Sequence, residues 1–437
     1  MTSLWNPDTR YALILYKWIL SFLGVWPLRG EGIIETIHSS LIIFALVAIV
    51  IPQCIDLYFN WDNLGNTIDN LTTSVSIVTV IFKLLTLNFY KDNTAACVNS
   101  IINDWNKIED NEYRKIMKRH CAFGRIASIG IMSMAYVTCM MFFIMAIAAT
   151  VMTDCSAQNL TTTCKTLPLP SNYIIDTGIS PIYEFLFLLQ IIQALISASG
   201  NNATDGFMFF LTMHICGQLE ILKIEFRRMG QVSVSLQSSI TKVEIYRNKM
   251  ISLTKRHHEI IRFSKNLHDT FNIMILAQLL TSSILICVVG FQLMLFLETG
   301  NIIGAGKHML YTTVLLIQLF LYSYAGDYLQ TQSSDLVHAV YESPWWEMPP
   351  SVARNILLVM VRAGHPLQIL AGDFYAMTLE KFTDIVKTSF SYLSVLLTNH
   401  AIKPLHSRLI RYVIRNISVN FSHIEGTRSS RITALLF

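Results

Sequence analysis

Seven separate stretches of about 20 predominantly apolar residues constrain this chain more than any other feature. Each stretch is long enough to cross a bilayer core of about 30 Å as an α-helix. Because 52% of the residues are hydrophobic and only 14% are charged, a water-soluble fold would lack the polar surface to cover its core. The sequence therefore predicts an all-α membrane protein with seven transmembrane helices. The predicted spans are 37–59, 68–90, 126–152, 182–204, 271–297, 308–329 and 376–398.

The number of charged residues in each stretch indicates how well it suits a membrane span. The third and fifth contain none. The second contains Lys83, about two turns from its inner end, where we expect the ammonium group to extend to the lipid headgroups. The seventh is the weakest, because Glu380, Lys381, Asp384 and Lys387 lie in its first half. Only the second half of the seventh span is apolar enough for lipid or a pore.

Residues 11–26 form a shorter apolar stretch before the first span. Lys17 lies in its middle and Arg10 at its edge. These charges and the short length favour an amphipathic or re-entrant helix over a membrane span. The stretch is not preceded by a basic region or followed by a small-residue cleavage site, so we do not expect a cleaved signal peptide.

The distribution of positive charge predicts the orientation. Connections on one side of the spans, together with the N-terminal stretch, contain 22 Lys and Arg residues, and those on the other side contain 2. Positively charged connections remain in the cytoplasm. We therefore expect a cytoplasmic N-terminus and an external end of the seventh span, the reverse of a G-protein-coupled receptor.

The loop after the third span contains two features of an external loop. Asn159-Leu160-Thr161 is a glycosylation acceptor sequence. Cys155 and Cys164 are close enough in sequence to form a disulfide in an oxidising compartment.

The basic segment 219–270 separates the fourth and fifth spans. It contains ten Lys and Arg residues that alternate with apolar positions at helical spacing. We expect cytoplasmic extensions of the two spans that form a helical anchor, with attraction to anionic lipid of the inner leaflet as a side effect.

Motifs of catalysis are absent from the sequence. It contains no Gly-x-Ser-x-Gly, no phosphate-binding loop, no His-Glu-x-x-His and no Cys-x-x-Cys. No basic aromatic platform for nucleic acid is present either. We expect no enzyme, no catalytic residue, no cofactor, no metal site and no nucleic-acid partner. Charges buried deep in several spans would favour a transporter, but the charges cluster at span ends and in the seventh span.

Short motifs between residues 320 and 397 occur in a characteristic order. They are 323–329 (SYAGDYL), 339–342 (AVYE), 345–346 (WW), 349–350 (PP), 371–374 (AGDF), 377–379 (MTL), Phe382 and 391–396 (SYLSVL). Weaker matches lie at 167–168 (LP), 180–184 (SPIYE) and 216–220 (CGQLE). In this order and spacing, the chain resembles an insect odorant receptor of the tuning class, with a hymenopteran character.

The resemblance implies a ligand-gated, non-selective cation channel in the plasma membrane of an olfactory sensory dendrite. It implies a heterotetramer with the shared odorant receptor co-receptor. It also implies an odorant pocket within one subunit, in the outer half of spans two, three, four and six. A small volatile ligand needs buried apolar area and one or two polar groups. Candidate pocket residues are Thr73, Ile77, Met141, Phe142, Met145, Tyr183, Phe187, Gln190, Tyr311 and Leu315.

The resemblance also assigns a pore helix to the end of the seventh span. Candidate pore and gate residues are Tyr392, Val395, Leu396 and Asn399. Val395 matches a hydrophobic gate position, whereas Asn399 is polar where the co-receptor pattern has a second apolar residue. The basic tail 399–437 departs from the family, whose members end shortly after this motif. We expect either an extension without a role or a seventh segment that does not cross.

These expectations divide the chain into five parts. They are a cytoplasmic N-terminus (1–36), spans one to four with the pocket (37–218), the basic anchor segment (219–270), spans five to seven with the pore helix (271–398) and the tail (399–437). Three other functions are compatible with parts of the pattern: a gustatory-type channel, a metabotropic seven-helix receptor and a transporter. A seven-span pattern alone does not decide between them.

Overall fold

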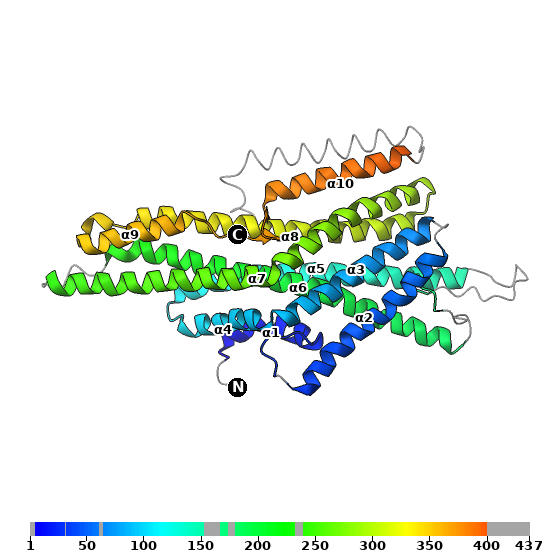
Figure 1. Ribbon diagram of the computed structural model, residues 1–437, viewed down its shortest axis with the longest axis horizontal. Coiled ribbons are helices and arrows are strands. Elements are labelled where there is room, and N and C mark those ends of the chain that lie inside the picture. The colour runs from blue at the N-terminus through cyan, green and yellow to red at the C-terminus, as the bar shows by residue number, and fades with distance from the viewer. Residues whose placement is uncertain are drawn as a thin grey trace, which may run out of the picture.

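A computed structural model of the chain is almost entirely helical (Figure 1). It describes residues 5–30, 32–60, 64–152, 167–173, 180–231 and 239–399. The α-helices are α1 (Pro7–Phe22), α2 (Ile33–Phe59), α3 (Leu64–Phe89), α4 (Lys91–Lys107), α5 (Asn111–Met152), α6 (Ile182–Arg227), α7 (Ser239–Glu298), α8 (Ile302–Tyr341), α9 (Pro350–Ala363) and α10 (Leu379–Asn399). Short elements are the 3-10 helices η3 (Arg228–Gln231) and η4 (Trp345–Glu347) and the strands β1 (Leu370–Ala371) and β2 (Tyr375–Ala376).

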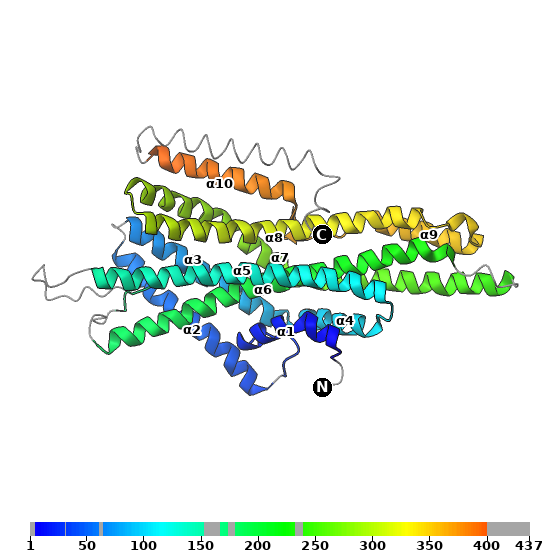
Figure 2. The same cartoon turned by 180° about the vertical axis from the view of Figure 1, so that it is seen from behind.

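Six helices of the described chain are long and apolar enough to cross a membrane, namely α2, α3, α5, α6, α7 and α8. The 60-residue α7 is about 90 Å long at 1.5 Å per residue, three times the thickness of a bilayer core. In Figures 1 and 2, the end of α6, the start of α7 and the end of α8 continue side by side, with α9, away from α2 and α3. The basic segment is thus helical on both sides of residues 232–238, which lie outside the described part.

Local sequence signals begin and end these helices. At the start of α1, the side chain of Asn6 accepts a hydrogen bond from the backbone N–H of Thr9 (2.7 Å), and Pro7 occupies the first helical position. Between α7 and α8, Gly300 adopts a positive φ of 71°, which glycine accepts without strain. Asn301 then caps α8 through the N–H of Gly304 (2.9 Å). This turn makes α7 and α8 antiparallel neighbours.

The N-terminal helix α1 packs against α4, α5 and α6. Ala12, Leu13 and Tyr16 are buried on one face, whereas the side chain of Trp18 is 73% exposed on the other. The Tyr16 hydroxyl lies 2.8 Å from the Ser128 hydroxyl of α5. Of the two predicted alternatives, the structure has the burial pattern of an amphipathic helix that covers the bundle.

A small hairpin of β1 and β2 connects the inner end of the bundle to α10. Its turn places Gly372 and Asp373 at positive φ. The Asp373 carboxylate accepts hydrogen bonds from Asn272 and His268 of α7, both at 2.8 Å. These two hydrogen bonds lower the pKa of Asp373, Asn272 contributing most. The hairpin is thereby fixed to α7, and α10 returns along the outside of α7 and α8 (Figure 1).

Candidate functional site

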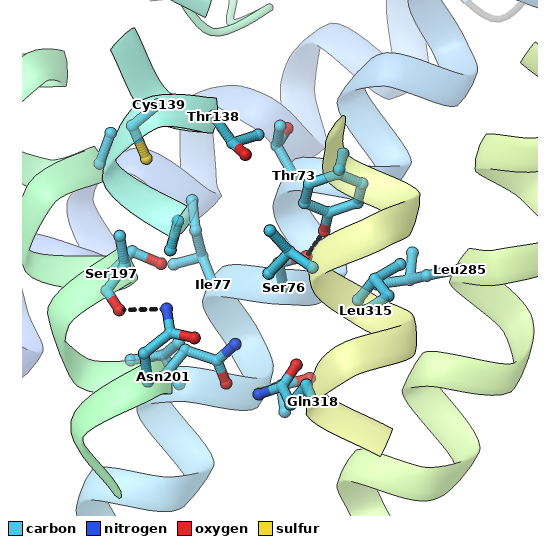
Figure 3. A pocket seen from close by; sticks show the side chains of 18 of the residues that line it. Thr73, Ser76, Ile77, Thr138, Cys139, Ser197, Asn201, Leu285, Leu315 and Gln318 are labelled. Carbon is cyan, nitrogen blue, oxygen red and sulfur yellow. Dashed lines mark hydrogen bonds between the residues drawn. The ribbon is translucent and has the colours of Figure 1, made fainter. Parts of the chain in front are cut away.

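A cavity of about 130 Å³ lies between α3, α5, α6, α7 and α8 (Figure 3). For comparison, an apolar cavity of about 150 Å³ in another protein holds benzene. The volume therefore suits one ring-sized or short-chain organic molecule. The lining residues are Thr73, Ser76, Ile77, Thr79, Val80, Ala135, Thr138, Cys139, Phe142, Phe143, Leu169, Ala194, Ser197, Ala198, Asn201, Asn202, Gln278, Thr281, Leu285, Tyr311, Val314, Leu315 and Gln318.

The exposed surface of the cavity is mainly apolar, although 11 of its 23 lining residues carry a hydroxyl or an amide group. Tyr311 of α8 reaches α3, and its hydroxyl lies 2.7 Å from the hydroxyl of Ser76. Figure 3 shows Ser76 at the cavity wall, with Asn201 and Gln318 at one end of the cavity and Thr73 and Thr138 at the other. A few polar groups in an apolar cavity are typical of small-molecule sites, where they fix the orientation of the ligand.

A loop segment, residues 167–173, contributes Leu169 to the cavity wall. The side chain of Gln190 holds this segment: its Oε1 accepts a hydrogen bond from the N–H of Leu169 (2.9 Å), and its Nε2 donates to the Ser171 hydroxyl (2.7 Å). The N–H of Asn172 also donates to the carbonyl of Pro52 in α2 (3.0 Å). Gln190 therefore positions part of the wall without lining the cavity.

Half of the predicted pocket residues line the cavity. Thr73, Ile77, Phe142, Tyr311 and Leu315 do so. Five others, Met141, Met145, Tyr183, Phe187 and Gln190, lie outside the lining.

Helix geometry explains the division. On α5, the lining positions follow one face through Ala135, Thr138 and Phe142. Met141 lies off that face, whereas Met145, three residues after Phe142, lies one turn further along it than the lining residues. The rings of Tyr183 and Phe187 contact one another with centroids 5.7 Å apart. These two residues lie in the first turns of α6, before the part that reaches the cavity.

The prediction missed the contribution of α7 and the cavity-facing part of α6. From α7, Gln278, Thr281 and Leu285 line the cavity. From α6, small and polar residues line it at helical spacing, namely Ala194, Ser197, Ala198, Asn201 and Asn202. Small and polar side chains on one face of an apolar span are a sequence signal for a protein-facing surface, and this signal marks the α6 wall.

An ion pair lies buried inside the bundle. The Lys83 ammonium of α3 is 2.6 Å from the Asp205 carboxylate of α6, and their side chains are 0% and 7% exposed. The prediction that Lys83 extends to the lipid headgroups is wrong, because the lysine is enclosed by protein and paired. The prediction that charges cluster at span ends missed Asp205 for a related reason: α6 continues well beyond the predicted end of the fourth span.

Both residues of this ion pair make further hydrogen bonds. Lys83 donates to the side-chain oxygen of Asn201 (2.6 Å), and Asp205 accepts hydrogen bonds from Gln318 and Tyr322 of α8. Asn201 and Gln318 also line the cavity. The ion pair thus lies about one turn further along α3, α6 and α8 than the cavity and is joined to its inner end.

The predicted pore residues lie on α10. The side chains of Tyr392 and Val395 are 63% and 59% exposed. Tyr392 also lines a groove of about 330 Å³ between α7 and α10. The side chains of Leu396 and Asn399 are outside the described part. The same holds for Cys155, Cys164, Asn159 and residues 400–437, so the disulfide, the glycosylation site and the tail stay predictions.

The sequence profile of the 7tm odorant receptor family matches residues 63–390. The match covers most of the chain and includes the cavity-lining helices and the ion pair. This chain belongs to the odorant receptor family. The resemblance to insect odorant receptors is confirmed, and the hymenopteran character stays a prediction.

Curated relatives are insect odorant receptors. The receptor is 27% identical over 49% of its length to odorant receptor 10a of Drosophila melanogaster (52% of that protein). It is 32% identical over 44% of its length to odorant receptor 13a of the same species (48% of that protein). The receptor thus spans about half the length of these two relatives. With odorant receptor Or2 of Anopheles gambiae it is 21% identical over 79% of its length, which is 87% of that protein.

The fold matches a solved insect olfactory receptor. The structure of OR5 from Machilis hrabei superposes with a TM-score of 0.73 at 16% identity, covering 89% of this receptor and 99% of that chain. The OR5 complex with eugenol gives a TM-score of 0.74, covering 90% and 99%. The prediction of an all-α, seven-helix membrane fold is confirmed; α10 covers the residues of the predicted seventh span. The family also confirms that the chain is a receptor rather than an enzyme.

Proposed function

We propose that this odorant receptor binds a small volatile molecule in the cavity between α3, α5, α6, α7 and α8 and thereby opens a non-selective cation channel. The observation that carries the proposal is the cavity itself, which five helices enclose with mainly apolar side chains. Burial of apolar ligand surface supplies the binding free energy at about 25 cal/mol per Å². The complex of OR5 with eugenol adds support, because that receptor has the same fold.

The proposed channel is a heteromer with the odorant receptor co-receptor, located in the plasma membrane of the sensory dendrite. The exposed face of α10 supports an assembly of several subunits. Tyr392 and Val395 lie on this face and are not covered by the rest of the described chain. In a channel, such a face would contact neighbouring subunits or the pore, where apolar side chains regulate conduction by excluding water.

Whole-cell recording from a heterologous cell tests this function. We expect volatiles to evoke a cation current when the receptor and the co-receptor are both expressed, and no current from the receptor alone. An evoked current without the co-receptor would contradict the heteromer, and substrate uptake without current would indicate a transporter. If no volatile evokes a current although both chains are expressed at the cell surface, the proposed channel function would be contradicted.

The variant Ala198→Leu tests the cavity as the binding site. Ala198 lines the cavity, so a larger side chain occupies ligand space at a steric cost of about 1–3 kcal/mol. We expect the half-maximal ligand concentration to rise by about tenfold or more. Leu195→Phe is the matched control, because Leu195 lies on the same helix, is 37% exposed and does not line the cavity. Equal effects of both variants would contradict the assignment.

The variant Val395→Ala tests the proposed pore. We expect a change in the relative permeability to different cations, because removal of two methyl groups widens and wets an apolar constriction. Val361→Ala is the control, since Val361 is also exposed (69%) but lies on α9. Unchanged permeability ratios in Val395→Ala would argue that α10 of this subunit does not line the conduction path.

A further inference from the structure

Hydroxyl groups in the cavity wall direct their protons away from the cavity. The hydroxyls of Ser76, Thr79 and Thr138 each donate to the backbone carbonyl four residues earlier, at 2.8–2.9 Å. Because the proton of Ser76 is used in this way, the hydroxyl of Tyr311 is the donor in the 2.7 Å contact with Ser76. These four hydroxyls therefore offer lone pairs, not protons, to a ligand.

Two amide side chains in the wall also use their N–H donors within the protein. The Nε2 of Gln278 donates to the Ser282 hydroxyl (2.9 Å) and to the Oε1 of Gln318 (3.2 Å). The Nδ2 of Asn202 donates to the carbonyl of Ala198 (2.8 Å). The N–H groups of both amides thus have protein acceptors.

The oxygens of these two amides have no such partner. The Oε1 of Gln278 and the Oδ1 of Asn202 are buried and have no hydrogen-bond donor among the described residues. Gln278 is 3% exposed and Asn202 is 2% exposed, and both line the cavity. A buried acceptor without a donor is unfavourable, and a ligand that brings a donor removes this penalty.

Asn201, another amide of the wall, bonds to the buried ion pair. The Asn201 side-chain oxygen is already occupied by Lys83. At Gln278 and Asn202, the wall therefore has two amide oxygens without a donor among the described residues.

We propose that the cavity selects small alcohols and phenols, whose hydroxyl donates to Gln278 or Asn202, over hydrocarbons, ethers and esters of similar shape. This inference rests on the proposed function and adds the ligand class. An ether or ester has acceptors only, so it leaves both amide oxygens unpaired and adds a further unpaired acceptor. A hydrocarbon leaves them unpaired as well.

Ligand pairs that differ only in the hydroxyl test this selectivity. In phenol against toluene, and in benzyl alcohol against ethylbenzene, a methyl group of similar size replaces the hydroxyl. Binding is measured on the purified full chain as the rise in its unfolding temperature with ligand concentration. We expect the hydroxyl compound to bind about 3- to 10-fold more tightly than its partner, as one neutral hydrogen bond predicts. Anisole, an acceptor without a donor, should bind no better than toluene.

Variants locate the selectivity within the cavity. Gln278→Met and Asn202→Leu keep the side-chain size and remove the acceptor, so one or both should abolish the preference for the hydroxyl compound. Gln193→Met is the matched control: Gln193 is 1% exposed and its Oε1 also has no donor among the described residues, but it does not line the cavity. It should keep the preference intact. Because the Gln278 amide also bonds Gln318, Asn202→Leu serves if Gln278→Met fails to fold.

The outcomes separate this inference from the proposed function. The ligand class would be overturned if phenol and toluene bound equally, or if anisole bound more tightly than toluene. A preference for the hydroxyl compound that survives both cavity variants would overturn it as well. Preferential binding of alcohols without any evoked current would support the ligand class and contradict the channel. Loss of the preference in Gln193→Met to the same extent would overturn the assignment to Gln278 and Asn202.

Discussion

The middle and the inner end of α6 each place a charged side chain in an ion pair, in opposite surroundings. Asp205 and Lys83 are 2.6 Å apart with side chains 7% and 0% exposed, whereas Arg227 and Glu342 of α8 are 2.7 Å apart with side chains 51% and 55% exposed. The distances are nearly equal, so geometry does not distinguish the pairs. The two ion pairs differ instead in their access to water.

The two surroundings require different support for the charges. Inside the bundle, each ion has lost its hydration and must recover hydrogen bonds from protein groups. Asp205 does so through Lys83, Gln318 and Tyr322. At the inner end, water solvates the ions and screens their attraction, and such pairs contribute about 0–1 kcal/mol. The comparison predicts large effects of substitutions in the middle of α6 and small effects at its end.

The largest effect is expected for Lys83→Met. This change leaves the Asp205 carboxylate buried without its counter-ion, which lowers the free energy of unfolding by about 3–5 kcal/mol. Unfolding of the purified receptor in detergent measures the loss. The double variant Lys83→Met/Asp205→Leu should recover part of it, since an apolar pair of similar volume needs no counter-ion. A single variant as stable as the unaltered receptor would refute the difference between the two pairs.

An intermediate effect is expected for Gly206→Ala, next to Asp205. The added Cβ would lie 2.6 Å from the Oγ and 2.9 Å from the Cβ of Ser128. The Ser128 hydroxyl is held by the carbonyl of Gly124 (2.8 Å), so the clash is not relieved by rotation, and we expect a loss of about 1–3 kcal/mol.

Gly217→Ala is the matched control nearer the inner end. There the nearest atom is the Sδ of Met117 at 2.9 Å, at the far end of a flexible side chain. The gain in helix propensity, about 1 kcal/mol, offsets the small rearrangement. The same unfolding measurement should show a near-neutral change. A larger loss in Gly217→Ala than in Gly206→Ala would reverse the expected order.

The smallest effect is expected for Arg227→Gln. Removal of an exposed pair should change the free energy of unfolding by less than about 1 kcal/mol, and added salt should reduce the difference further. Arg228→Gln, which removes the exposed pair with Glu112, should behave alike. A salt-independent loss as large as that of Lys83→Met would show that the inner end is not solvated as its exposure indicates.

Hydropathy predicted the helical spans well because crossing a bilayer depends on the composition of one continuous segment. The end of an apolar window does not mark the end of a helix, however: the fourth span is predicted to end at residue 204, and α6 continues to Arg227. From Asn202 to Leu219 every residue of α6 is buried. Neighbouring helices cover this part, so its burial does not depend on an apolar composition.

The candidate site could be predicted only in part, because it too depends on how neighbouring helices pack. Thr73, Ile77 and Leu315 line the cavity, and their role in ligand binding stays a prediction. The rotation of each helix about its axis decides which side chains face the cavity, and apolar residues that face lipid look the same in the sequence as those that face a ligand. Met141 illustrates this limit. The contribution of α7 depends on how that helix crosses its neighbours.

The sequence by itself determined that the chain is a seven-span membrane protein of the odorant receptor family with its positive charge on one side. These properties follow from segment length, composition and the order of short motifs, all of which are local. Only the tertiary structure decided that Lys83 meets Asp205, 122 residues away. It also decided that Gln278 and Asn202, whose amide oxygens have no donor among the described residues, line one cavity. Pairing and enclosure depend on the relative positions of several helices, and no single segment encodes them.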